Sequence, residues 1–206
     1  MNVRDVLESY RQGKIDLQRA EQLLRMDFLE RVGEHTLFDH AREARRGIPE
    51  VIWGENKSPA MVAEIVSAIL KDRDAVLISR ASPDHVKVLK ATVDEEHVRY
   101  IERSKLIVVD RRKDRPKIGK IGILTAGSSD IAVAEEAKAM AEVMGCEVLT
   151  EYDIGVAALH RFLDPLSKML DQGVDALVVV AGMEGALPTV VSGLADVPII
   201  GVPTSV

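Results

Sequence analysis

Along the second half of the chain, short runs of apolar residues alternate with stretches in which apolar positions recur at helical spacing. The apolar runs predict strands over residues 118–124, 147–150, 176–180 and 198–202. The stretches between them predict helices over residues 129–144, about 156–171 and about 184–194. The runs are apolar throughout, which is typical of strands whose sheet is covered on both faces. Strands and helices that alternate in this way predict a parallel sheet with right-handed crossovers.

The first half of the chain is less regular and predicts a mixture of helices and strands. Helical spacing, together with caps or proline at the first helical position, predicts helices over 3–10, 16–26, 58–71 and from Ser82-Pro83 onward. Short apolar runs predict strands over 51–53, 75–79 and 106–110. The basic and polar segment 111–117 is interpreted as a linker. We therefore expect a helical and α+β region over 1–115 and an α/β domain over 116–206.

Polar and small residues of the second half gather where the predicted strands end. Ligands of parallel sheets bind at the carboxyl ends of the strands. The turn that begins at Gly127 opens a helix, so free backbone N–H groups and the helix dipole converge there and can hold an anion. Ser128 and Ser129 add hydroxyl donors, and Asp130 adds an acceptor suited to a ribose hydroxyl. This stretch therefore predicts a site for a nucleotide or a sugar phosphate.

Composition narrows the classes of function. Hydrophobic residues make up 47% of the 206 residues, which is enough for a sizeable core, and the net charge of −6 argues against nonspecific nucleic-acid binding. The single cysteine, Cys146, excludes an internal disulfide. The first residues do not resemble a signal peptide, and the longest apolar run is far short of the roughly 18–20 residues that span a membrane. We expect a soluble cytoplasmic protein with neither nucleic-acid nor membrane partners.

Several motifs resemble one known superfamily. The turn at 127–130 is similar to the glycine–serine–aspartate turn of the PurE-type aminoimidazole ribonucleotide carboxylases and mutases, and His160-Arg161 resembles the histidine–arginine pair of those enzymes. Longer segments resemble the LarB branch: DHAREARRGIPEVIWGE (39–55), YDIGVAALHR (152–161), VAGMEGALP (180–188) and VPTSV (202–206). The similarity runs from about residue 15 to the end. It implies a PurE-like (flavodoxin-like, Rossmann-type) three-layer parallel sheet, preceded by a smaller α+β N-terminal region.

The resemblance also implies an enzyme of nickel-pincer cofactor biosynthesis. The LarB family carboxylates the pyridinium ring of nicotinic acid adenine dinucleotide with CO₂. It also hydrolyses the phosphoanhydride, which yields AMP and pyridinium-3,5-biscarboxylate mononucleotide. A pyridinium ring is electron-poor, so a nucleophile must first add to it, and in the family a cysteine thiolate does so. That cysteine lies downstream of the segment matching 202–206, so we expect the domain to continue past Val206 and interpret Cys146 as a structural or surface thiol.

The resemblance and the local chemistry together assign catalytic roles to Glu184, His160 and Asp130. Glu184 lies within residues 182–185, which have a glycine at either end, at a predicted helix start where a negative charge interacts favourably with the helix dipole. We expect it to be the base for the ring proton or to position the attacking group. His160 is expected to bind substrate or handle protons. Arg161 could hold a carboxylate or phosphate through two parallel hydrogen bonds.

The residues expected to bind substrate are Gly127, Ser128, Ser129, Asp153, Arg161, Gly182 and Gly185. Simpler roles stay open for some of them, since the serines and Asp130 could only cap a helix and Asp153 could only close a turn. No tightly bound cofactor or metal is expected, because Asp39 and His40 lack a third ligand, and Mg²⁺ on a pyrophosphate is left open. The basic group Arg42, Arg45 and Arg46 is a solvated face by default, with a collar for the pyrophosphate or adenylate end of a dinucleotide as the alternative.

The resemblance implies a homo-oligomer, with an octamer as one option. Two other functions stay open. The first is an aminoimidazole ribonucleotide carboxylase or mutase of purine biosynthesis, against which the long N-terminal region argues. The second is a non-catalytic nucleotide-binding module.

Overall fold

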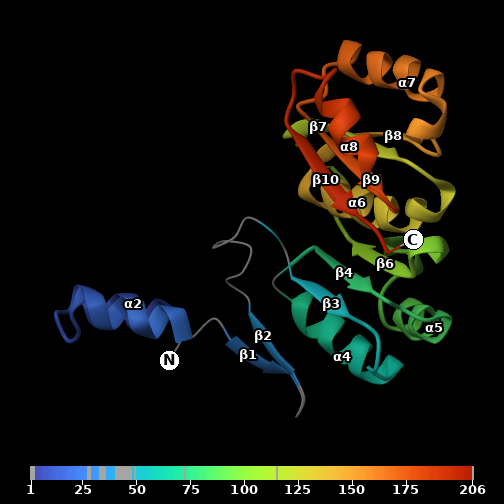
Figure 1. The fold of residues 1–206 in the computed structure, drawn as a ribbon. Coiled ribbons are helices and arrows are strands. Elements are labelled where there is room, and N and C mark those ends of the chain that lie inside the picture. Colours follow the sequence, from blue (N-terminus) through green and yellow to red (C-terminus); the bar gives the residue numbers. More distant parts are fainter. Residues whose placement is uncertain are drawn as a thin grey trace.

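The computed structural model describes residues 3–26, 29–32, 36–39, 48, 50–71, 73–114 and 116–205 (Figure 1). Its elements in the N-terminal part are α1 (Val3–Arg11), α2 (Leu17–Met26), β1 (Leu29–Val32), β2 (Thr36–Asp39), β3 (Val51–Trp53), α4 (Pro59–Ile69), β4 (Ala75–Ser79), α5 (Pro83–Thr92), β5 (Val98–Ile101) and β6 (Leu106–Asp110). The C-terminal part contains β7 (Gly119–Thr125), α6 (Ile131–Met144), β8 (Cys146–Glu151), α7 (His160–Asp171), β9 (Ala176–Ala181), α8 (Ala186–Ser192) and β10 (Ile199–Pro203). Single 3₁₀ turns are η1 (Glu95–His97), η2 (Glu102–Ser104), η3 (Ser128–Asp130) and η4 (Val156–Ala158).

The C-terminal sheet has the strand order β10-β9-β7-β8, and all of its neighbouring strands are parallel. Leu177 and Val179 of β9 face α7 and α8 and share a buried cluster with Phe162. Val180 of the same strand faces the opposite side, where it packs with Ala134 of α6. Alternate residues of each strand therefore meet helices on opposite faces, which confirms the expected three-layer α/β architecture.

The N-terminal sheet is mixed, with the order β3-β4-β6-β5. β3 and β4 are parallel, whereas β6 runs antiparallel to both β4 and β5. α4 and α5 cover one face, and their starts are capped as the sequence predicts: the backbone N–H groups of Met61 and His85 donate to the hydroxyls of Ser58 and Ser82. Asp16 likewise accepts from the N–H of Arg19 at the start of α2.

Helix α6 is the layer that the two sheets share (Figure 1). Ala134 faces the parallel sheet, while Ala139 and Val143 pack against Leu77 and Val108 of the N-terminal sheet. A helix that is buried on two sides needs apolar or small residues around most of its circumference, as α6 has. The layers therefore follow as helices, sheet, helix, sheet, helices.

Polar contacts also join α6 to the N-terminal sheet. Arg99 of β5 donates from Nη2 to Glu142 Oε2 at 2.7 Å. Arg112 donates to the carbonyl of Val143 at 2.8 Å while its guanidinium also contacts both carboxylate oxygens of Asp110. The last carbonyls of a helix have no partner within the helix, so Arg112 satisfies one of them.

The remaining described elements lie before β3. α1 and α2 pack against each other with Val6 and Ala20 buried, and β1 pairs with β2 as an antiparallel hairpin. Within the described residues, no helix combines the length and the apolar character that crossing a membrane would require.

The structure corrects several element predictions. β1, β2 and β5 were not predicted, because the polar and charged residues in each obscure any apolar run. The helix expected from residue 184 starts at Ala186, since Gly185 has a left-handed φ of 63°, and it ends at Ser192. The helices expected from 129 and 156 each begin with a 3₁₀ turn instead, η3 and η4. The boundary between residues 115 and 116 stays a prediction.

Replacing Ala139 with leucine tests the place of α6 between the sheets. Ala139 is fully buried, so the added carbons must displace α6 or the N-terminal sheet. We expect Ala139→Leu to lower the free energy of unfolding by about 1–3 kcal/mol in urea denaturation. The control Ala91→Leu lies on an exposed position of α5 and should change it by less than about 0.5 kcal/mol. Equal effects of the two variants would contradict this packing.

Candidate active site

The parallel strands end at one edge of their sheet, and the loops that follow β7, β8 and β9 surround a cavity of about 300 Å³. All three loops that the sequence singles out contribute to it. Its lining residues are Ala126, Gly127, Ser129, Asp130, Gly155, Val156, Ala157, Ala181, Gly182, Met183, Glu184, Ala186 and Leu187.

Asp130 is the most deeply buried polar residue of the cavity wall, with 2% of its surface exposed. Its Oδ2 accepts from the backbone N–H of Gly127 at 2.9 Å, and its Oδ1 accepts from the hydroxyl of Thr204 at 2.6 Å. The carboxylate therefore closes the turn after β7 and ties it to the end of β10. Each oxygen keeps a further lone pair, so the contact predicted with a substrate hydroxyl stays a prediction.

The two serines of this turn are exposed, and only Ser129 lines the cavity. Both belong to η3, and α6 follows directly at Ile131. α6 begins without a side-chain cap at Asp130, whose carboxylate accepts from the Gly127 N–H instead. The first backbone N–H groups of α6 have no partner within the helix, and Ser129, which lines the cavity, precedes them in the chain.

The loop after β8 is held against the loop after β7. The N–H of Asp153 donates to Thr125 Oγ1 and the N–H of Ile154 donates to the Thr125 carbonyl, each at 3.0 Å. Asp153 adopts a left-handed φ of 59°, which is uncommon for a residue with a side chain and is often found at functional sites. At Gly155 a Cβ atom would lie 2.7 Å from the carbonyl oxygen of Ala126, so only glycine allows this approach.

Five predicted site residues lie beside the cavity rather than in its wall. They are Ser128, Asp153, His160, Arg161 and Gly185. His160 and Arg161 are exposed at the start of α7, and Arg161 Nη1 lies 4.0 Å from Asp153 Oδ2. This exposed ion pair contributes little to stability. The roles expected for these residues in substrate binding and proton handling stay predictions.

The loop after β9 places a carboxylate and an apolar side chain at the cavity. The N–H of Gly185 donates to the carbonyl of Gly182 at 2.9 Å, which closes a tight turn around Met183 and Glu184. Glu184 is exposed, lines the cavity and precedes α8 by two residues. Met183 also lines the cavity, although 91% of its surface is exposed and its φ is 52°. No sequence signal singled out Met183, because one methionine in a glycine-rich turn resembles many others.

Tyr152 supports the loop after β8 from the side of α6. Its hydroxyl donates to Glu135 Oε1 in the first turns of that helix. Burial and this hydrogen bond raise the pKa of Tyr152 to about 12. Thr125, Thr204 and Tyr152 are thus positioning residues that sequence reasoning missed, since their partners lie far away along the chain.

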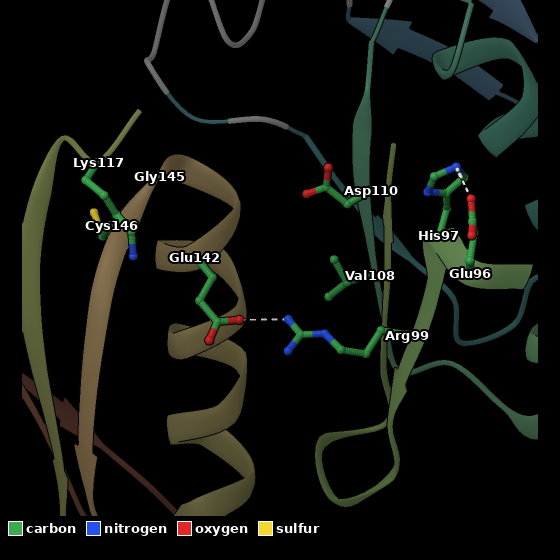
Figure 2. A pocket seen from close by; sticks show the side chains of 9 residues that line it. All are labelled: Glu96, His97, Arg99, Val108, Asp110, Lys117, Glu142, Gly145 and Cys146. Carbon is green, nitrogen blue, oxygen red and sulfur yellow. Dashed lines mark hydrogen bonds and ion pairs between the residues drawn. The ribbon is translucent and has the colours of Figure 1, made fainter. Parts of the chain in front are cut away.

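Cys146 lies at the opposite edge of the parallel sheet, at the start of β8. It is the first of the six residues of β8, so about 17 Å of strand separate it from the strand's carboxyl end. It lines a second cavity, of about 480 Å³, between α6 and the N-terminal sheet. Figure 2 shows Arg99 and Glu142 reaching toward each other in this second cavity, with Cys146 and Lys117 on the side of the parallel sheet.

The structure leaves the metal and arginine interpretations of the N-terminal segment open. Within the described ranges, no three His, Cys, Asp or Glu side chains come together as a metal ion would require. His40 lies outside the described residues, and so do Arg42, Arg45 and Arg46.

The Asp130 contacts predict a stability effect. Asp130→Asn keeps the shape of the side chain but replaces a charged acceptor with a neutral amide, which weakens the bond from the Gly127 N–H and makes the Thr204 hydroxyl accept instead of donate. We expect the free energy of unfolding to fall by about 2 kcal/mol in urea denaturation. Ser128→Ala, in the same turn but exposed, is the control and should change it by less than about 0.5 kcal/mol. An Asn variant as stable as the control would rule out the tie between the turn and β10.

The Tyr152 hydrogen bond predicts a pH dependence. Because the pKa in the folded state exceeds the ordinary value of 10.0, the stabilisation is complete below pH 10 and is lost as pH rises toward about 12. Phenolate absorbance should therefore show one of the three tyrosines ionising near pH 12. Tyr152→Phe should remove that step, whereas Tyr10→Phe, at an exposed tyrosine, should retain it. A late step that survives Tyr152→Phe would refute the assignment.

Comparisons with known proteins give a family match for each of the two parts of the chain. Residues 29–112 match the LarB/PurE-like N-terminal domain, and residues 120–206 match the AIR carboxylase domain. An uncharacterized protein of Methanocaldococcus jannaschii is 39% identical over 211 residues, which cover 99% of this chain and 81% of that protein. A protein named as a probable N5-carboxyaminoimidazole ribonucleotide mutase, from Methanothermobacter thermautotrophicus, is 31% identical over 91 residues, 42% of this chain and 26% of that protein. The chain therefore belongs to the LarB/PurE-like family, in which a LarB-type N-terminal domain precedes an AIR carboxylase domain of carboxylase-family function.

Proposed function

We propose that the protein carboxylates the pyridinium ring of nicotinic acid adenine dinucleotide with CO₂ and hydrolyses its phosphoanhydride. The products are pyridinium-3,5-biscarboxylate mononucleotide and AMP, and the reaction belongs to nickel-pincer cofactor biosynthesis. The mutase relative matches 42% of this chain, whereas the LarB-type match adds residues 29–112. This wider match supports the LarB reaction over that of a purine enzyme.

The charge of the cavity is the observation that carries the proposal. Among the described residues that line it, the charged side chains are Asp130 and Glu184, and both are acidic. The nearby cation Arg161 lies outside the wall and faces Asp153. A cavity with this charge favours a cationic ring over a neutral one, because opposite charges attract at short range in a partly desolvated site. The nicotinate ring has a positive nitrogen next to its carboxylate and can turn that nitrogen toward the acidic wall, whereas a neutral aminoimidazole ring has no such charge.

The turn at 127–130 supplies donors on the other side of the same cavity. The Ser129 hydroxyl and the N–H groups at the start of α6 suit the ribose phosphate that is attached to the ring. A cavity of about 300 Å³ is at the lower end of small-molecule sites, so we assign it to the pyridinium ribotide half of the dinucleotide.

In the proposed reaction, a thiolate adds to the ring and makes a neighbouring ring carbon electron-rich. That carbon bonds to CO₂, Glu184 takes the ring proton, and departure of the thiolate restores the aromatic ring. Cys146 is not assigned the thiolate role, because it lies at the opposite edge of the sheet. The resemblance implies a thiol downstream of the segment that matches 202–206. Separately, water cleaves the phosphoanhydride and AMP leaves.

A comparison of oxidised and reduced dinucleotide tests the role of cavity charge. The reduced ring is neutral, so we expect calorimetry to show tighter binding of the oxidised form. Glu184→Gln should weaken binding of the oxidised form about fivefold, from loss of roughly 1 kcal/mol of attraction, and leave the reduced form unchanged. Glu151→Gln, exposed at the end of β8 and outside the cavity wall, is the matched control. Equal affinities for the two forms would remove the basis of the proposal.

The activity itself is measured by incorporation of labelled bicarbonate carbon and release of AMP. The purine alternative has one specific support, the name of the mutase relative. Stronger thermal stabilisation by aminoimidazole ribonucleotide than by the nicotinate dinucleotide would favour that alternative. Tight binding without turnover by the full-length natural protein would favour a nucleotide-binding module.

A further inference from the structure

The only tryptophan of the sequence lies on the surface, at the end of the N-terminal sheet. Trp53 is the last residue of β3, and 51% of its surface is exposed. The guanidinium carbon of Arg80 lies 5.6 Å from the centroid of its ring. Arg80 follows β4 directly and has a left-handed φ of 53°, which is costly for a residue with a side chain. The pair forms a planar, cationic and aromatic surface.

Backbone contacts fix this surface in place. The N–H of Gly54 donates to the carbonyl of Ser79 at 2.7 Å, so the ends of β3 and β4 are held together. A Cβ atom at Gly54 would lie 2.9 Å from the same oxygen, so the approach requires glycine. Lys57 donates from Nζ to the carbonyl of Trp53 at 2.7 Å. The aromatic ring is thus presented by a rigid strand end rather than by a free loop.

The pair lies beside the half of α6 that leads to the candidate active site. Leu77 of β4 packs near Ala139 and Val143, so β4 runs along α6. Farther along, burial raises the pKa of Glu136, and the charge of Arg80 partly offsets that rise, so the two side chains influence each other electrostatically. Glu136 is six residues beyond Asp130, which is about 9 Å along a helix. The end of β4 that carries Arg80 therefore lies nearer the start of α6, and so the cavity turn, than Leu77 does.

Two requirements of a dinucleotide remain unmet by the cavity. At about 300 Å³ it is assigned one ring and one ribose phosphate, and its charged wall residues are acidic. The adenine ring needs an aromatic partner, and base–aromatic stacking contributes about 1–3 kcal/mol per base. The adenylate phosphate needs a cation. Trp53 and Arg80 supply these two groups together, with the guanidinium over the indole ring and about half of the tryptophan surface exposed.

We propose that Trp53 and Arg80 bind the adenylate half of the dinucleotide, with the adenine stacked on the indole and the phosphate near the guanidinium. This inference rests on the proposed function. It assigns adenylate binding to the N-terminal domain. An enzyme whose substrate is a mononucleotide would not need this function. The alternative is that this surface cation–π pair only stabilises the fold, by about 0.5–1 kcal/mol. The experiment must distinguish this structural role from adenylate binding.

The single tryptophan makes the test direct, because all tryptophan emission comes from Trp53. The full chain is excited at a wavelength that adenine does not absorb and is titrated with AMP, nicotinate mononucleotide and the dinucleotide. We expect saturable quenching by AMP and by the dinucleotide. The mononucleotide should bind in calorimetry without a saturable change in emission.

Variants separate binding from folding. Trp53→Leu and Arg80→Ala should each weaken AMP and dinucleotide binding about tenfold and leave mononucleotide binding within twofold. Trp53→Phe should restore part of the affinity, and Arg103→Ala, at an exposed arginine of η2, is the control for lost surface charge. Far-ultraviolet circular dichroism checks that each variant is folded.

The outcomes distinguish this inference from the proposed function. If the dinucleotide binds while AMP leaves the emission unchanged and both variants bind normally, the adenylate site is refuted and the proposed function stands. If AMP quenches and both variants lose AMP binding in calorimetry, while the mononucleotide does not bind and the dinucleotide binds no more tightly than AMP, the adenylate site is supported and the proposed function fails.

Discussion

The packing of helix α6 against two sheets is the constraint on which the rest of the structure depends. Ala134 meets the parallel sheet, and Ala139 and Val143 meet the N-terminal sheet. Small side chains let both sheets approach the helix closely, and interiors packed this tightly transmit strain rather than absorb it. The turn at 127–130 is the start of this same helix. The position of this turn is therefore fixed by the hydrophobic cores of both domains. A ligand bound at the turn would contact a part of the chain that neither domain can move alone.

The shape of the cavity is well defined because hydrogen bonds join its loops to one another, in addition to the strands that carry them. Thr125, the last residue of β7, accepts from the loop after β8 through both its hydroxyl and its carbonyl. Asp130 joins the turn after β7 to Thr204 beyond β10. Buried polar groups are costly unless they are hydrogen-bonded, so these contacts favour a single arrangement of the loops. The glycines permit the close approach, and the threonines and Asp130 fix it.

The sequence predicted the parallel sheet well, because both buried faces make its strands continuous apolar runs, and every strand of that sheet lies within two residues of its expected bounds. It also located the cavity loops, since parallel strands bring their carboxyl ends to one edge. It could not reveal β5, in which Arg99 interrupts the apolar pattern in order to reach Glu142. It could not reveal the bond between Asp130 and Thr204 either, because no local pattern relates residues so far apart. His160 and Arg161 adjoin a cavity loop in sequence, but the helix that begins there carries them to the surface.

The separation of charge across α6 connects the two proposed halves of the substrate. Acidic side chains line the cavity at the start of the helix, and the Arg80 guanidinium lies over Trp53 along its flank. Both halves of the dinucleotide carry one phosphate, so the charge that distinguishes them is the positive ring nitrogen, which matches the end of the molecule that holds Asp130 and Glu184. The reverse orientation would place the positive ring nitrogen beside the Arg80 guanidinium, which disfavours it. Such a ligand would then be positioned before any chemical step, with its pyridinium ring beside Glu184 and its phosphoanhydride between the two domains. In this view the N-terminal domain is the part of the molecule that orients a dinucleotide, and the parallel sheet is the part that acts on its ring.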